Sequence, residues 1–322
     1  MADGKWINGL APEMSVADAA RVVLAARFEV VRQYLPLAAE RPDEDTEHVH
    51  QLRVGTRRAG AAVRVFAGCL PRKHLRAAKR TLRTIRRAAG DARDCDVFLE
   101  HLTAHQQAAP PEAKPALDFL LGYALGERSA AQARLVQAAA EAGPGFAPDT
   151  ALLPAHVRPP RDDDAPQTFG ELAALHLGEL LGEFNAAVEA DPTEPPALHQ
   201  LRILGKRLRY AVEIFAGCFA SPLREALYPA VEEVQELLGE IQDAAVGVVR
   251  LEGLRGRAQR VILAEWPRLR AGIDGLIDEL REKIPTGRER FRAWRERWTR
   301  LTAEHGPESL RLVPAALGEH AA

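Results

Sequence analysis

The 322-residue chain has little cysteine, few aromatic or β-branched residues, and no long uncharged apolar run. Three scattered cysteines are too few for a disulfide framework or a cysteine zinc cluster. No stretch approaches the roughly 18 apolar residues that cross a bilayer. Residues 1–8 also lack the basic and apolar segments of a secretion signal. We therefore expect a cytoplasmic protein without a membrane segment.

Lysine is also scarce, with 6 residues against 37 arginines. The formal net charge of −2 disfavours an acidic ligand, but the charges are segregated along the chain. Residues 50–93 hold thirteen Arg or Lys and one acid, Asp91, whereas acidic runs lie at 43–47 and 162–164. Such segregation creates a local positive field that the total charge hides.

The second half of the chain repeats a motif of the first half at a constant spacing of 149 residues. The equivalent pairs are His50/His199, Arg53/Arg202, Arg57/Lys206, Arg58/Arg207, Phe66/Phe215, Cys69/Cys218, Gly90/Gly239 and Asp94/Asp243. No insertion separates the two copies over about 45 residues. A long-period repeat of this kind predicts an internal duplication of one structural unit.

The apolar residues recur at helical spacing almost everywhere, which predicts an all-α protein. Short breaks between successive helices are typical of antiparallel bundles, so we expect two pseudo-symmetric four-helix bundles. The predicted units are an N-terminal bundle at 15–142, a Pro/Gly/Asp-rich linker at 143–167, a C-terminal bundle at 168–303 and a tail at 304–322.

Local signals predict where individual helices begin and end. Ser15, with Asp18 three residues later, is typical of a helix start. Gly90 and Gly239 are interpreted as helix stops, and Asp94 and Asp243 as caps or ion-pair partners. The later helices are expected at 168–190, from about 197 to 219, from there to 238, at 243–264, at 267–283 and at 288–301.

The helix that carries the motif has an apolar face and a basic face, since residues lie 100° apart around its axis. The expected buried stripes are Leu52, Ala59, Val63, Phe66 and Leu70 in the first copy and Leu201, Leu208, Val212, Phe215 and Phe219 in the second. The opposite faces carry His50, Arg53, Arg57 and Arg64, and then His199, Arg202 and Lys206. Glu213 replaces Arg64 in the second copy.

The next helix of the first half is strongly basic. One broad face of it carries Arg72, Arg76, Lys79, Arg80, Arg83, Arg86 and Arg87. Like charges three or four residues apart destabilise a helix, and a solvated face normally mixes both signs, so this pattern favours a polyanion ligand. Guanidinium forks hold phosphate oxygens in pairs. The segment lacks exposed aromatic or amide groups for reading bases, which favours a ligand made mainly of phosphate.

The runs HQLRVGTRRAGAAVRVF, AAGDARDCDVFLEHL, LHQLRILGKRLRYAVEIF and LLGEIQDAAV resemble the CHAD family, the conserved histidine α-helical domain. The resemblance spans about residues 16–301. It implies two four-helix bundles, inorganic polyphosphate held by basic side chains at their interface, and association with polyphosphate granules. The implied contacts are His50, Arg53, Arg57, Arg58 and Arg83, and His199, Arg202, Lys206, Arg207 and Arg209. The first copy departs from the pattern at Gly60, where the second has Arg209.

The candidate polyphosphate site also includes Arg76, Lys79, Arg80 and Arg87 from the basic helix. We expect a non-catalytic binding protein with no cofactor or metal, because no nucleophile–base pair is evident. The alternatives are a phosphohydrolase or phosphotransferase, which would need acidic ligands facing the arginines, and a nucleic-acid-binding protein. His101 and His105 have metal-like spacing but are expected to be solvated. The arginines and tryptophans of 288–301 either extend the basic surface or close the second bundle.

Overall fold

The computed structural model describes residues 5–42, 44–143, 145–160 and 165–313. The first half contains α1 (Val16–Glu40), α2 (Glu47–Val65), α3 (Arg72–Ala108) and α4 (Lys114–Ala142). The second half contains α6 (Phe169–Glu189), α7 (Pro195–Phe215), α8 (Tyr228–Val261) and α9 (Trp266–Ser309). The described residues form no strand, so the predicted all-α class is confirmed.

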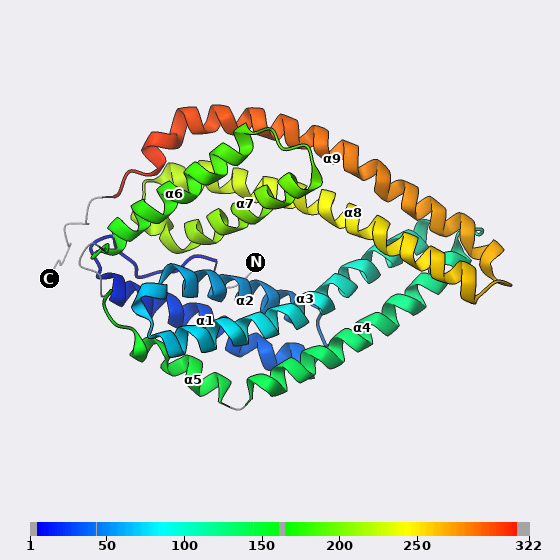
Figure 1. The fold of residues 1–322 in the computed structure, drawn as a ribbon, viewed down its shortest axis with the longest axis horizontal. Coiled ribbons are helices and arrows are strands. Elements are labelled where there is room, and N and C mark those ends of the chain that lie inside the picture. The colour runs from blue at the N-terminus through cyan, green and yellow to red at the C-terminus, as the bar shows by residue number, and fades with distance from the viewer. Residues whose placement is uncertain (1–4, 43, 144, 161–164, 314–322) are drawn as a thin grey trace.

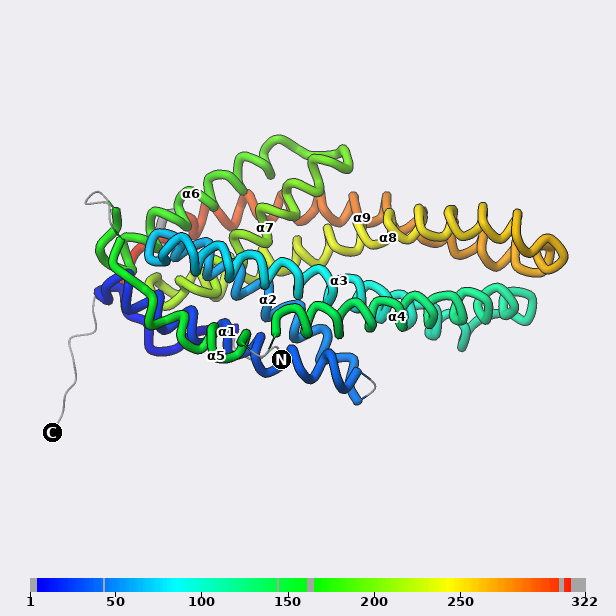
Figure 2. Tube along the Cα trace, turned by 60° about the horizontal axis from the view of Figure 1, so that its bottom comes forward, coloured from blue at the N-terminus to red at the C-terminus, as the bar shows by residue number. Residues whose placement is uncertain are grey.

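Each half contributes four long helices that follow one another along the chain. The second long helix of each half carries the motif, and these two helices, α2 and α7, pack against each other. The pairs α3–α4 and α8–α9 form long hairpins that extend past the shorter helices and converge at one end of the molecule (Figures 1 and 2). We call these hairpins the two arms. Their convergence brings α4 into contact with α9.

The apolar core is shared by the two halves. One cluster of buried residues includes the stripes of both motif helices, as expected, together with residues of α1, α3, α6 and α8. A second cluster lies between the arms and includes Leu102, Leu117, Leu254 and Ile273. Burial of these side chains is the main favourable contribution to folding. The three cysteines are free and buried.

Two helix starts have the capping geometry that local sequence favours. The Asp18 backbone N–H donates to Ser15 Oγ over 3.0 Å at the start of α1, as the sequence predicts. Thr168 and Glu171 form a reciprocal capping box at the start of α6. Each bond satisfies a backbone donor that the first helical turn leaves without a partner.

The prediction that helices stop at Gly90 and Gly239 is wrong. Gly90 lies inside the continuous 37-residue α3, and Gly239 lies inside the 34-residue α8. A glycine costs a helix about 1 kcal/mol relative to alanine, which the packing of a long hairpin offsets. Both positions face an arginine of the motif helix at ordinary contact distance. A Cβ at Gly90 would lie 3.9 Å from Arg53 Nε, and one at Gly239 would lie 3.9 Å from Arg202 Nη2.

The predicted break between 283 and 288 is also absent, since α9 runs continuously for 44 residues. Pro285 and Gly287 lie between the two predicted helices. Gly287 is instead a packing position, because a Cβ there would lie 2.5 Å from Ile241 Cγ1 of α8. Close approach of α8 and α9 therefore explains this glycine better than a helix end does.

The segment predicted as a linker, 143–167, is partly helical. It contains α5 (Phe146–Leu152) and the 3-10 helix η2 (Leu153–His156), both of which contact α1. Phe146, Leu153 and Val157 are buried in the shared core. Residues 144 and 161–164 of this segment, and 314–322 of the predicted tail, lie outside the described residues.

The tryptophans of α9 close the second half. Trp294 and Trp298 are buried against Phe184 of α6, and the indole N–H of Trp298 donates to Asn185 Oδ1 over 2.9 Å. Smaller elements link the helices: η1 (Ala67–Cys69), η3 (Ala216–Cys218) and the π-helical η4 (Leu223–Leu227). Within the described residues, no helix has both the length and the apolar character needed to cross a membrane.

Candidate anion-binding groove

A groove of about 700 Å³ lies where α2 and α3 of the first half face α7 of the second. We call it the basic groove. Its cationic lining residues are Arg53, Arg57 and Arg64 of α2, Arg86 and Arg87 of α3, and Lys206 and Arg207 of α7. Gly90, Asp91, Asp94, Ile203 and Tyr210 complete the lining. Three helices from the two halves are thus needed to build it.

Arg57 lies at the centre of this positive charge. Burial lowers the pKa of Arg53, Arg86 and Arg202, and repulsion from Arg57 lowers it further in each case. Burial likewise lowers the pKa of Arg64, followed by repulsion from Arg86 and Arg207. Guanidinium groups stay charged despite such shifts, so the groove stores electrostatic repulsion that an anion would relieve.

The same repulsion acts on Lys206 and changes its pKa by a large amount. Burial, together with Arg57, Arg202 and Arg53, lowers the pKa of its ammonium from 10.5 to about 7. Asp243 offsets part of this decrease. A lysine gives up its proton where an arginine does not, and therefore the charge of the groove changes near neutral pH.

Most cations of the groove lack an acidic partner. Arg53 has Asp94 at 3.6 Å, and Arg207 has Glu183 at 3.0 Å. Among the described residues, no carboxylate oxygen lies within 4.0 Å of the remaining five, which are Arg57, Arg64, Arg86, Arg87 and Lys206. The arrangement fits a ligand that brings several negative charges at once.

Five of the predicted contact residues line the groove, namely Arg53, Arg57, Arg87, Lys206 and Arg207. Arg202 borders it, close enough to Arg57 for mutual repulsion and to Asp243 for attraction. Arg83 lies beside Arg86. Helical spacing, which places one arginine on each successive turn, accounts for this part of the prediction.

Arg58 does not reach the groove, although it was predicted to bind the ligand. Its side chain is 5% exposed, and Arg58 Nε donates to Glu213 Oε2 over 2.7 Å. Arg209 also turns toward Glu213, with Arg209 Nε 3.8 Å from Glu213 Oε1 and its guanidinium on the ring of Tyr210. Glu213 is buried, so it is no surface counterpart of Arg64.

The remaining predicted residues lie outside the lining. His50 is half-buried near Arg93, Glu47 and Glu100, and burial lowers its pKa. His199 is exposed near the start of α7. The four others are exposed along α3, which extends the positive charge from one side of the groove: Arg76, Lys79, Arg80 and Arg83.

The sequence-based site omitted seven of the lining residues, among them Arg64, Arg86 and Tyr210. Arg64 shares a helix face with Arg57, and Arg86 shares one with Arg87, so helical spacing in the sequence was a signal for both. Tyr210 follows the motif arginines directly, but nothing in its spacing distinguished a groove residue from a core residue.

Carboxylates also reach this region. Asp91 and Asp94 line the groove, and Asp243 lies near Arg202 and Lys206. Burial raises the pKa of Asp243, Arg202 lowers it, and the negative charge of Asp94 raises it. Among the described residues, these three aspartates do not form a metal-ligand group; the one such group is His101, His105 and Glu279, outside the groove.

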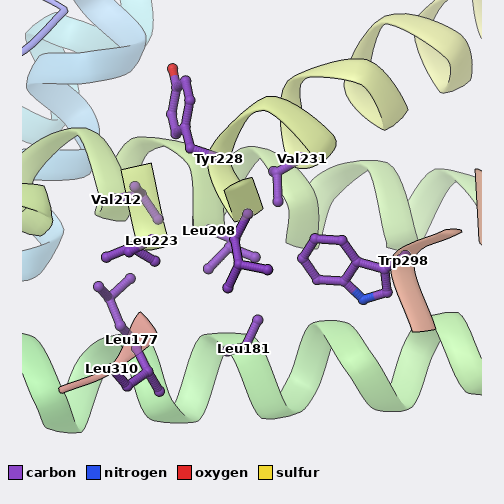
Figure 3. Close-up of a pocket in the computed structure, with 10 residues that line it drawn as sticks. Leu177, Leu181, Leu208, Val212, Leu223, Tyr228, Val231, Trp298 and Leu310 are labelled. Carbon is purple, nitrogen blue, oxygen red and sulfur yellow. The ribbon is translucent and has the colours of Figure 1, made fainter. Parts of the chain in front are cut away.

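A second pocket lies inside the second half and differs from the basic groove in its lining and its volume. Its lining is apolar and includes Leu181, Leu208, Val231 and Trp298 (Figure 3). Its volume is about 10 Å³. A cavity of that size has room for about one water molecule, so it is a packing void and no ligand site.

Comparisons with known proteins agree with this architecture. The sequence pattern of the CHAD domain matches residues 22–252. The structure is similar to the CHAD domain of the plant Ricinus communis, with a TM-score of 0.67 and 21% identity over 92% of this chain and 96% of that chain. It is also similar to PptA from Streptomyces chartreusis, with a TM-score of 0.64 and 20% identity over 87% and 99%. No curated protein matches the sequence. Since the pattern covers more than half of the chain, this protein belongs to the CHAD domain family.

Proposed function

We propose that this protein binds inorganic polyphosphate in the basic groove without catalysing its turnover. The single observation that carries the proposal is the set of five groove cations without a carboxylate partner among the described residues. A linear chain of phosphates brings about one negative charge per unit and offers oxygens to successive guanidinium forks. Arginine is suited to such bidentate contacts.

The composition of the groove favours phosphate over a nucleic acid. Ile203 and Tyr210 are its only apolar lining residues within the described structure. Proteins that hold single strands usually stack bases on several aromatic rings, and base readers use Asn or Gln beside Arg. The exposed basic residues along α3 extend the groove in one direction, which suits a ligand of indefinite length.

The experiment is a titration with long-chain polyphosphate at two salt concentrations. We expect tight binding at low salt and a steep loss of affinity at high salt, because phosphate recognition depends on charge. Competition with duplex and single-stranded nucleic acid at equal phosphate concentration identifies the ligand. Displacement of polyphosphate by either nucleic acid would contradict the proposal.

A polyphosphate hydrolase or phosphotransferase is the second candidate. Asp91, Asp94 and Asp243 favour it, because they place carboxylates beside the arginines. Two-metal phosphoryl-transfer sites need such acidic ligands, but these three side chains do not converge on one point. Loss of polyphosphate or triphosphate that depends on Mg²⁺, and that Asp94→Asn abolishes, would replace the binding proposal with this one.

We further propose an association with polyphosphate granules as the cellular consequence of binding. A fluorescently tagged chain is expected to gather on granules. The same chain carrying Arg57→Glu should stay dispersed, because the substitution reverses the charge at the centre of the basic groove.

A further inference from the structure

Two histidines near the C-terminal end of α3 and a glutamate of α9 meet between the two arms. The arms converge at one end of the molecule (Figure 1). His101 and His105 lie four residues apart on α3, and Glu279 comes from the other half of the chain. One ligand atom of each residue lies within 4.8 Å of the other two. The site borders the apolar cluster between the arms, which includes Leu102 and Leu276.

The hydrogen bonds of His105 leave one ring nitrogen facing a negative charge. His105 Nδ1 lies 2.8 Å from the backbone oxygen of His101, so Nδ1 carries a proton and donates it. His105 Nε2 lies 2.7 Å from Glu279 Oε2. Two acceptors do not approach to that distance without a proton between them, so this contact carries a second proton. A metal ion could replace that proton if the two atoms moved apart to about 3.4 Å.

The surroundings of His101 favour a metal ion in place of this proton. Its ring stacks on His105 with 4.1 Å between centroids, and both of its nitrogens are shielded from solvent. Within the described structure neither nitrogen has a hydrogen-bond partner. A shielded imidazole without a partner is costly. A metal ion bound by one of these nitrogens would remove that cost.

We propose that His101, His105 and Glu279 bind a transition-metal ion, with Zn²⁺ as the best-fitting ion, and so tie α3 to α9. Two histidines one helical turn apart with a glutamate from elsewhere are a common set of zinc ligands. The bond from His105 Nδ1 to a backbone carbonyl is the outer contact that orients a metal-binding histidine.

Metal binding needs a modest rearrangement of the three side chains. Bonds of about 2.1 Å place tetrahedral ligand atoms about 3.4 Å apart, so separations of up to 4.8 Å must shrink by up to about 1.4 Å, and His105 Nε2 and Glu279 Oε2 must move apart by about 0.7 Å. Lys283 pairs with Glu279 Oε1 at 2.7 Å, which leaves Oε2 for the metal.

The site is independent of polyphosphate binding, because it uses no residue of the basic groove. Its consequence is mechanical: a bound ion would clamp the two arms, which come from different halves. An ion that binds only the folded chain also stabilises it by mass action.

The test uses the full chain without a histidine tag, stripped of metal with a chelator. Zn²⁺ is titrated against a chromophoric chelator, and Co²⁺ is followed by its visible absorption. We expect one ion per chain, the intense bands of four-coordinate Co²⁺, and a higher melting temperature with Zn²⁺. His101→Ala and Glu279→Gln should each weaken binding at least tenfold and remove the metal-dependent rise in melting temperature.

The matched control is His74→Ala. His74 stacks on His156 with 3.9 Å between centroids, but this pair belongs to no three-ligand group of the described residues. The control should bind metal as the wild type does. Failure of the wild type to bind a stoichiometric ion, or undiminished binding by Glu279→Gln, would overturn the proposal. Glu279 is partly exposed and its change to Gln keeps its shape, so this variant gives a result even if His101→Ala does not fold.

Discussion

Arg58 and Glu213 form a buried ion pair between the two motif helices, with Arg58 Nε 2.7 Å from Glu213 Oε2. Both residues are at most 5% exposed. Arg27 of α1 lies 3.9 Å from the same carboxylate, and Tyr228 of α8 donates its hydroxyl proton to Glu213 Oε1 over 2.9 Å. One carboxylate from the second half thus compensates two buried arginines from the first.

The first prediction concerns this pair. Glu213→Gln should lower the free energy of unfolding by about 3–5 kcal/mol, because it removes the counter-charge of the buried Arg58. Urea denaturation measures the change. Glu183→Gln removes an exposed partner of Arg207 and should cost less than about 1 kcal/mol. Equal effects of the two substitutions would contradict the structural role of Glu213.

The second prediction concerns the centre of the basic groove. Arg57→Glu should weaken polyphosphate binding more than tenfold, since Arg57 adjoins Arg53, Arg86, Arg202 and Lys206. Titration at fixed salt measures it. Arg292→Glu changes the net charge equally on the exposed face of α9 and should have little effect.

A charge reversal on both motif helices tests the same groove more severely. Arg53→Glu combined with Arg202→Glu should reduce the affinity by orders of magnitude, because the two arginines belong to different halves and flank the groove together. Far-UV circular dichroism checks that the variant folds. A folded double variant that binds normally would show that the ligand lies elsewhere.

The third prediction is a pH dependence that comes from Lys206. Its pKa is about 7 in the free protein, because of burial and the neighbouring arginines. Bound polyphosphate favours the protonated ammonium and raises this pKa, so binding takes up a proton. The affinity should therefore fall as the pH rises above 7, by at most about tenfold per pH unit for one proton.

Variants at position 206 separate this effect from titration of the ligand. Lys206→Arg stays charged and should bind with an affinity that changes little between pH 7 and 9. Lys206→Met should bind more weakly and without that pH dependence. A wild-type affinity that is constant over this range would show that Lys206 is not coupled to the ligand.

The fourth prediction contrasts two helical glycines. Gly287→Ala should lower the free energy of unfolding by about 1–3 kcal/mol, because its methyl group would press on Ile241. Gly122 is exposed in α4 and has no atom within 4 Å of a Cβ, so Gly122→Ala should add about 0.5–1 kcal/mol. Thermal unfolding of both variants is the measurement. In an Ile241→Ala background, the cost of Gly287→Ala should largely disappear.

Much of the fold could be predicted, because local patterns determine helical class and helix faces. The apolar stripe from Leu52 to Leu70 is buried as expected, and Ser15 begins α1. Gly90 was wrongly predicted to end a helix, and the helix also continues through Gly287, because a glycine at a helix end and a glycine under a close helix contact, such as Gly287, are identical in sequence. The partner that requires the second kind lies far away along the chain.

The sequence alone established a helical protein with two copies of a basic motif and an excess of positive charge in residues 50–93. Those properties depend on periodicity and composition, which each segment carries by itself. Only the tertiary structure decided which cations share the groove, that Arg58 is buried against Glu213, and that His101 and His105 meet Glu279. Such groupings arise when helices from separate halves pack, and side-chain distances across that packing are not encoded in the spacing of any one helix.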